Sequence, residues 1–161
     1  MASPQHYVLF TDGGSRGNPG PAGVGVALLT ADGTEVFGAG RFLGDTTNNV
    51  AEYSALIWGL EIAAAHGATT LEVRADSELV IKQMKGLYRV KHPNLQPLYA
   101  QARGLADELG RTTFTHVPRS QNKRADELAN LAMDARRAVG DVLDPDMLCS
   151  GSQDRLFGDD I

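Results

Sequence analysis

The chain has 161 residues, of which 42% are hydrophobic and 22% are charged, and its net charge is -5. This composition is typical of one soluble globular domain and excludes a disordered or fibrous polymer. A single cysteine cannot form an intramolecular disulfide, and no apolar run approaches the ~18 residues that span a membrane. We therefore expect a cytoplasmic protein that makes no membrane contact.

The charge is unevenly distributed along the chain. Six of the 20 acids and one of the 15 bases lie beyond Gly140, which leaves 14 of each in residues 1–140. The final segment also loses hydrophobic periodicity, so we expect a folded domain over residues 1–140 and an acidic, flexible tail over residues 141–161. Two basic clusters, in residues 82–91 and 119–124, either bind phosphates or form ordinary solvated surface.

The first part of the domain has the pattern of an antiparallel meander. Residues 7–11 are an aromatic and β-branched run that predicts a strand, and the turn-rich sequence GGSRGNPGPAG after it predicts a long loop. A period of two over residues 23–28 predicts the second strand. A third strand is predicted at residues 34–42, after an Ala-Asp-Gly turn.

Beyond the meander the hydrophobic period changes to about 3.6. A capping box from Asn49 to Glu52 predicts a helix over residues 50–66, with a glycine ending it. The remaining elements are predicted as a strand at 70–75, helices at 77–85 and 94–109, a strand at 112–117 and a helix at 125–139. The order is βββαβααβα. We expect the first and fourth strands to be parallel neighbours, with the second and third strands extending the sheet on one side.

Four acidic residues lie at or near the ends of these elements. Asp12 follows the first strand and Asp76 the fourth, while Glu52 and Asp126 lie in the first turns of helices. Neighbouring strands are roughly 4.8 Å apart, so both aspartates can reach one ion. Clustered carboxylates repel one another, and Mg²⁺ or Mn²⁺ is the counter-charge that oxygen ligands favour. Two such ions about 4 Å apart can catalyse phosphodiester hydrolysis.

Three of these acids also have an ordinary structural role open to them. Glu52 is placed to complete the capping box with Asn49, Asp76 to cap the helix that follows it, and Asp126 to favour a helix N-terminus by its charge. Asp12 has no helix to cap. The pattern therefore makes a four-acid metal site plausible without excluding the simpler roles.

The glycine-rich loop fits neither nucleotide-binding pattern, because it lacks a Gly-Lys-Ser/Thr ending and precedes a strand. Gly13, Gly14 and Asn18 nevertheless permit close approach to a sugar-phosphate backbone. A simple hairpin loop is the alternative.

Four sequence blocks together resemble the motifs of the type 1 ribonuclease H family. They are TDGGSRGNPGPAG, TTNNVAEYSALIWGLE, VRADSELVIKQMKG and VPRSQNKRADELAN, and the resemblance covers roughly residues 6–138. It implies an α/β ribonuclease H-like fold with a five-stranded mixed sheet and helices on both faces. It also implies an endonuclease that hydrolyses the RNA strand of RNA/DNA hybrids to 5′-phosphate and 3′-hydroxyl ends. We expect a monomer with no organic cofactor.

The resemblance assigns roles to particular residues. The metal-binding catalytic acids are Asp12, Glu52, Asp76 and Asp126, with Asp12 bridging two Mg²⁺ ions, or Mn²⁺ as an alternative. Family positions that meet the hybrid match Asn18, Asn48 and Asn49, and Thr47 matches a contact to a DNA phosphate. Further expected substrate contacts are Gly13, Gly14, Asn122, Lys82, Lys85 and Arg89.

The sequence departs from the family pattern in three places. Many members carry a histidine in a loop before the last acid; here His116 falls inside the predicted strand, and we expect Arg119 to take that place. The long basic protrusion is shortened to LYRVKHPNLQP, which weakens the expected hybrid binding of this segment. Glu78 stands where some members have glutamine, which weakens an expected minor-groove contact.

Two other functions would keep the same fold. One is a non-catalytic module that binds hybrids, although a pure binder gains nothing from four clustered acids. The other is a nuclease for double-stranded RNA or branched DNA, against which the asparagine-rich contact positions count.

Overall fold

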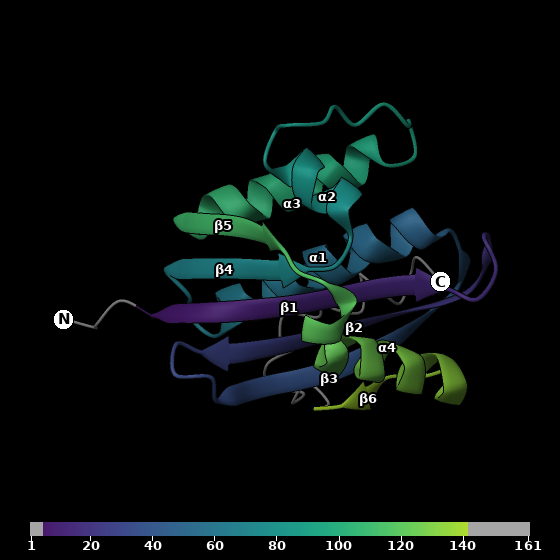
Figure 1. The fold of residues 1–161 in the computed structure, drawn as a ribbon, viewed down its shortest axis with the longest axis horizontal. Helices are drawn as coiled ribbons and strands as arrows, with labels where there is room; N and C mark the ends of the chain where they lie inside the picture. Colours follow the sequence, from purple (N-terminus) through teal and green to yellow (C-terminus); the bar gives the residue numbers. More distant parts are fainter. Residues whose placement is uncertain (1–4, 142–161) are drawn as a thin grey trace.

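The described strands form one mixed sheet in the order β5-β4-β1-β2-β3-β6 (Figure 1). They are β1 (His6–Ser15), β2 (Gly20–Thr30), β3 (Glu35–Thr46), β4 (Thr70–Ala75), β5 (Arg111–His116) and β6 (Val139–Gly140). β1, β2 and β3 form the antiparallel meander, and β4 pairs in parallel with both β1 and β5. The predicted α/β class and the parallel pairing of the first and fourth strands are confirmed.

Helices cover both faces of this sheet, as predicted (Figure 1). They are α1 (Asn48–Ala65), α2 (Glu78–Met84), α3 (Gln96–Glu108) and α4 (Lys123–Ala135), with a short 3-10 turn, η1 (Arg119–Gln121), before α4. α1 packs on β1 and β2 from one face, with α3 beside it, and α4 packs on β1, β2 and β3 from the other. β1, the strand that carries Asp12, therefore lies between α1 and α4.

The computed structural model describes residues 5–141, so the tail predicted at 141–161 lies outside the described residues except for Asp141. Oδ2 of Asp141 accepts a hydrogen bond from the N–H of Gly38 at 2.8 Å, and its own N–H donates to the Gly38 carbonyl at 2.7 Å. Asp141 thus extends the contact of β6 with β3.

The core lies mainly between α1 and the sheet. Leu56 and Leu60 of α1 are 2% and 0% exposed, and they belong to one apolar cluster with Leu9 of β1 and Val73 of β4. Each fully buried leucine contributes roughly 1.5–3 kcal/mol relative to an exposed one. Ala64, one turn after Leu60 on α1, is exposed. This core holds α1 against the strands that supply the acids.

Glycines let both helices approach the sheet closely. A Cβ atom at Gly13 of β1 would lie 2.2 Å from the carbonyl oxygen of Ala51 in α1. A Cβ atom at Gly25 of β2 would lie 2.0 Å from the carbonyl oxygen of Ala125 in α4. No side chain fits at either distance, so backbone contacts set the positions of the two helices.

The structure corrects the predicted end of the first strand. β1 continues through Ser15, because Gly14 and Ser15 still pair with β2, and β2 already begins at Gly20. Only residues 16–19 form the connection, so Asp12 lies within a strand and not after one. Most of the predicted long loop therefore belongs to the paired strands β1 and β2.

Two helix boundaries also differ from the prediction. α1 begins at Asn48, and its N-cap is Thr47, whose side chain accepts from the backbone N–H of Val50 at 3.3 Å. The predicted capping box at Asn49 is therefore wrong. α4 begins at Lys123 and ends at Ala135, because the next residue adopts a left-handed conformation that turns the chain into β6, a sixth strand that was not predicted.

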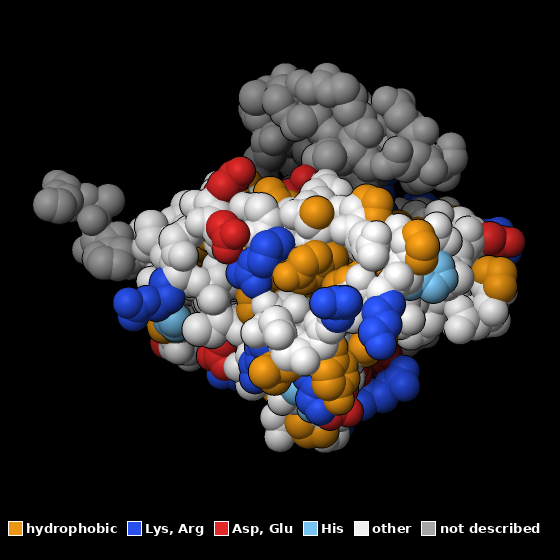
Figure 2. Space-filling model, turned by 90° about the horizontal axis from the view of Figure 1, so that it is seen from above, with side chains coloured by type: hydrophobic (Ala, Val, Ile, Leu, Met, Phe, Trp, Pro, Cys, Tyr) orange, Lys and Arg blue, Asp and Glu red, His pale blue; other side chains and the backbone are white. Residues whose placement is uncertain are grey.

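The segment between α2 and α3 carries exposed basic and apolar side chains. Figure 2 looks down on this end of the molecule, where Lys and Arg side chains lie beside apolar ones. Leu87 and Tyr88 are 67% and 49% exposed. Lys85 and Arg89 are also exposed, whereas Lys82 pairs with Glu78 at 2.7 Å. Among the three bases predicted to contact substrate, Lys82 is thus already neutralised within the protein.

Candidate active site

The candidate site forms where β4 separates from β1. The parallel pairing of these strands ends at Thr11 and Ala75, whereas β1 continues. Backbone groups on this edge of β1 then lack a strand partner, and side chains replace it. The N–H of Gly13 donates to Oε1 of Glu52 at 3.0 Å, and the carbonyl of Thr11 accepts from Nδ2 of Asn122 at 2.9 Å. Polar side chains from α1 and from the start of α4 thus fill the gap beside β1.

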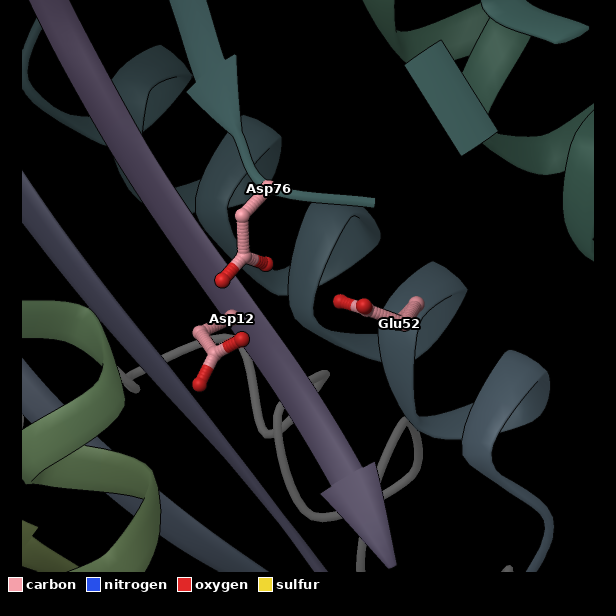
Figure 3. Close-up of side chains that lie close together, drawn as sticks. All are labelled: Asp12, Glu52 and Asp76. Atoms are coloured by element: carbon pink, nitrogen blue, oxygen red, sulfur yellow. The ribbon is translucent and has the colours of Figure 1, made fainter. Parts of the chain in front are cut away.

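Three carboxylates meet at this gap (Figure 3). Asp12 comes from β1, Glu52 from α1 and Asp76 from the residue after β4, and each offers an oxygen within 4.8 Å of the others. Asp12 and Glu52 are both 8% exposed. Asp126, in the first turn of α4, lines the same cleft, and its charge acts on Asp12. The structure therefore brings together the four acids that the sequence singled out.

The simpler roles for two of these acids do not hold. Because Thr47 caps α1, Glu52 lies beyond the third helical position, and its carboxylate accepts from Gly13 on a neighbouring strand. Ser77 caps α2 with its own side chain, which accepts from the helix backbone at 3.3 Å, so Asp76 is not the cap. Asp126 does lie where a negative charge favours a helix N-terminus.

Burial and mutual repulsion shift the protonation of the two most enclosed acids. Burial, followed by the charges of Glu52, Asp76 and Asp126, raises the pKa of Asp12 to about 9. Burial and the charge of Asp76 raise the pKa of Glu52 to about 8, against the opposing effect of its hydrogen bond from Gly13. A cluster of oxygen ligands that resists ionisation without a counter-charge fits a hard divalent cation.

We expect the stability of the metal-free protein to depend on pH through these acids. The pKa of Asp12 is raised from 3.8 to about 9, so the folded state retains a proton that the unfolded chain has lost. Stability should therefore fall as the pH rises from 5 to 9 in chelator. Thermal melts should show a smaller fall for Asp12→Asn. Equal pH dependence in the two proteins would contradict the assignment.

The four acids line an open cleft of about 530 Å³. Its other lining residues are Gly13, Gly14, Ser15, Arg16, Asn48, His116, Val117, Pro118, Arg119, Asn130 and Met133. Arg119 lies on η1, and its Nη2 donates to Oδ1 of Asp126 at 3.2 Å. His116 belongs to the fifth strand, as the sequence predicted, but it is the last residue of β5, and it also borders the cleft. Of the two, only Arg119 contacts one of the acids.

Internal hydrogen bonds orient two of the predicted hybrid contacts. Oδ1 of Asn18 accepts from the N–H of Asn48 at 3.0 Å, and Oδ1 of Asn48 accepts from the N–H of Ser15 at 3.4 Å. Because both amide oxygens already accept hydrogen bonds, the NH₂ groups are the groups that can donate to a substrate. Thr47 and Asn48 are exposed, and Asn49 is partly buried.

The structure does not support a substrate contact for Asn122. Its side chain is 1% exposed, and its NH₂ group is used by the carbonyl of Thr11. No donor to its Oδ1 is present among the described residues. Asn122 is buried because the carbonyl of Thr11 in β1 needs a hydrogen-bond donor where β4 no longer pairs with it. Thr11 lies far from Asn122 in the sequence. Gly13 likewise packs against α1, although it also borders the cleft.

Sequence reasoning missed Arg16 and Asn130, which also border the cleft. Arg16 lies between β1 and β2, and Asn130 lies one turn after Asp126 in α4. The i,i+4 spacing of Asp126, Asn130 and Asp134 puts three polar side chains on one face of a helix, and this signal could have found Asn130. No comparable local pattern marks Arg16.

Comparisons with known proteins give consistent findings. Residues 10–132 match the family model described as "Reverse transcriptase-like". The chain is 52% identical over 129 residues to the "Bifunctional protein Rv2228c" of Mycobacterium tuberculosis, covering 80% of this chain and 35% of that protein. It is 48% identical over 125 residues to the "Ribonuclease HI" of Halobacterium salinarum, covering 78% of this chain and 63% of that protein. The chain thus spans about a third of the length of the mycobacterial relative.

A solved structure has the same fold. It is the crystal structure of LC11-RNase H1 in complex with RNA/DNA hybrid, with a TM-score of 0.78 and 44% sequence identity, covering 81% of this chain and 98% of that one. Within residues 5–141, the structure contains no helix long and apolar enough to cross a membrane.

Proposed function

The chain belongs to the type 1 ribonuclease H family, and on this premise we propose that it is an endonuclease that hydrolyses the RNA strand of RNA/DNA hybrids. The observation that carries the proposal is the meeting of Asp12, Glu52 and Asp76 in an open cleft, with Asp126 beside them. A relative of known structure that binds RNA/DNA hybrid supports this choice of substrate.

The acids would hold two Mg²⁺ ions, with Mn²⁺ as an alternative. When bound, such ions activate a water for attack on the phosphodiester and stabilise the leaving oxygen. Asp12 has the other three acids around it and would contribute to holding both ions, while Glu52 and Asp76 would help to hold one and Asp126 the other. The chain needs no nucleophilic side chain, and Arg119 brings a positive charge to the cleft wall beside Asp126.

Recognition of the hybrid would fall to the donors beside this cleft. The NH₂ groups of Asn18 and Asn48 are fixed by their internal bonds and can donate to base edges and 2′-hydroxyls. The hydroxyl of Thr47 caps α1 and lies at an exposed position where a DNA phosphate can reach it. The proposed domain of residues 1–140 contains all of these groups.

The deciding experiment compares one end-labelled RNA strand presented alone, paired with RNA and paired with DNA. Each substrate is incubated with Mg²⁺, Mn²⁺ or chelator. We expect cutting of the hybrid only, in either metal, and none in chelator. A hybrid that is bound but never cut would establish the binding module, and cutting of the RNA duplex would establish a different nuclease.

Glu78 is expected to weaken hybrid binding. Its carboxylate holds Lys82 at 2.7 Å and adds negative charge near His116. Glu78→Gln should free Lys82 and lower the KM for hybrid several-fold at low salt, with a smaller effect at high salt because exposed charges are then screened. Asp107→Asn, which breaks a similar pair with Arg103 on α3, is the matched control and should leave KM unchanged.

A further inference from the structure

A line of polar contacts connects the β1–β2 turn to the carboxylate of Asp126. Nη2 of Arg16 donates to Oδ1 of Asn130 at 3.3 Å, and Nη1 of Arg16 pairs with Oδ1 of Asp134 at 2.7 Å. Asn130 in turn contacts Asp126, which lies one turn earlier in α4. Nδ2 of Asn130 donates to the backbone carbonyl of Asp126 at 2.9 Å and to Oδ1 of Asp126 at 3.3 Å. Arg16 and Asn130 are called the Arg16–Asn130 relay below.

The chemistry of the relay fixes which way the amide of Asn130 points. A guanidinium group can only donate, so the oxygen of Asn130 faces Arg16 and its NH₂ group faces Asp126. Arg119 donates to the same Oδ1 of Asp126 at 3.2 Å. Two donors therefore hold the same oxygen of this carboxylate, Oδ1, and neither of them contacts Oδ2.

Asp126 depends on such partners more than the other acids do. Its side chain is 29% exposed, and it lies outside the group of three acids whose oxygens approach within 4.8 Å of one another. Asp12 and Glu52, in contrast, are each 8% exposed, and Glu52 also accepts from the N–H of Gly13 inside the protein. Partners that hydrogen-bond to a metal ligand orient it and tune its affinity.

We propose that Arg16 and Asn130 are positioning residues for Asp126, which turn its Oδ2 toward the cation position of the cleft. The proposal rests on the proposed function, because it takes Asp126 as a metal ligand. The competing explanation is that Arg16 only anchors the β1–β2 turn to α4 through its ion pair with Asp134.

The substitution Asn130→Asp separates these explanations. It keeps the size of the side chain and strengthens the attraction to Arg16, so the β1–β2 turn would remain anchored to α4. It replaces the donor to Asp126 by an acceptor, so a positioning role would be lost. Asn130→Ala removes the side-chain contacts to Arg16 and Asp126 and keeps only the bond from Arg16 to the backbone carbonyl at 3.5 Å. Asp134→Asn is the matched control, because it breaks the ion pair with Arg16 and leaves Asn130 in place.

Kinetics give the first readout. We expect Asn130→Asp and Asn130→Ala to lower kcat at least about 10-fold, the lower range for loss of a ligand's supporting partner. Asn130→Ala should leave the KM for hybrid almost unchanged, and Asp134→Asn should behave as wild type. Melting temperatures recorded in parallel show that each variant is folded.

Metal binding gives a second readout that does not require cleavage. Free Mn²⁺ is measured by electron paramagnetic resonance in complexes with a hybrid whose RNA strand carries 2′-O-methyl groups. Both Asn130 variants should bind Mn²⁺ about 10-fold more weakly than wild type. An Asn130→Asp variant with wild-type kcat and Mn²⁺ affinity would overturn the proposed positioning role of Arg16 and Asn130. A wild-type protein that cuts no hybrid would overturn the proposed function instead, and the Mn²⁺ comparison would still decide the relay.

Discussion

Replacing Asp12 by asparagine is expected to lower kcat on RNA/DNA hybrid by at least about 1,000-fold, equivalent to about 4 kcal/mol of barrier. Asp12 is only 8% exposed, and the charges of Glu52, Asp76 and Asp126 all act on it. Asparagine keeps the shape of the side chain but removes the charge that would bridge two cations. Single-turnover cleavage of an end-labelled hybrid measures the effect.

The same variant should not be less stable than wild type. Asparagine carries no charge at any pH, so the variant avoids both the unfavourable burial of an ionised Asp12 and its repulsion by Glu52, Asp76 and Asp126. The melting temperature in chelator should therefore stay the same or rise. Loss of activity together with a large loss of stability would instead indicate a structural role for Asp12. Unchanged turnover would contradict its place in the site.

The substitution Gly25→Ala is expected to destabilise the protein by about 3 kcal/mol, at the upper end for an overpacked position. The added Cβ would lie 2.0 Å from the carbonyl oxygen of Ala125 and 2.7 Å from the backbone nitrogen of Ala129. Both are backbone atoms of α4, so the whole helix must move. Because α4 carries Asp126, cleavage should fall as well. Urea denaturation measures the stability.

Gly104→Ala is the matched control for this substitution. Gly104 lies within α3, and a Cβ there would meet nothing within 4 Å. Alanine favours a helix interior over glycine, so this variant should be more stable by roughly 0.5–1 kcal/mol. If both variants unfolded at the same urea concentration, that result would contradict the close packing of α4 against β2 at Gly25.

Local patterns in the sequence predicted most of the elements and all four acids. The periods of two and 3.6 follow from which side chains face the core, and glycines mark the helix ends, so these signals need no knowledge of distant contacts. Asp76 and Asp126 follow from the same local boundaries. The acids could be found because each lies at or near the end of an element that the pattern predicts.

The features that escaped prediction depend on partners far away in the sequence. β6 exists only because Val139 and Gly140 pair with β3, about 100 residues earlier. Asn122 is buried because the carbonyl of Thr11 lacks a strand partner, which follows from where β4 ends. The wrong capping box is different in kind, since Thr47 and Asn49 are both good caps and the local sequence alone does not choose between them.

The separation of β1 from β4 has a consequence for folding. The acids that meet there come from β1, α1, the end of β4 and the start of α4, so their assembly depends on contacts of high sequence separation. Such contacts form slowly, because the intervening chain must be ordered first. A segment ending after α1 carries only Asp12 and Glu52. Recovery of cleavage during refolding would therefore report the completed topology, whereas helix content would report only its local parts.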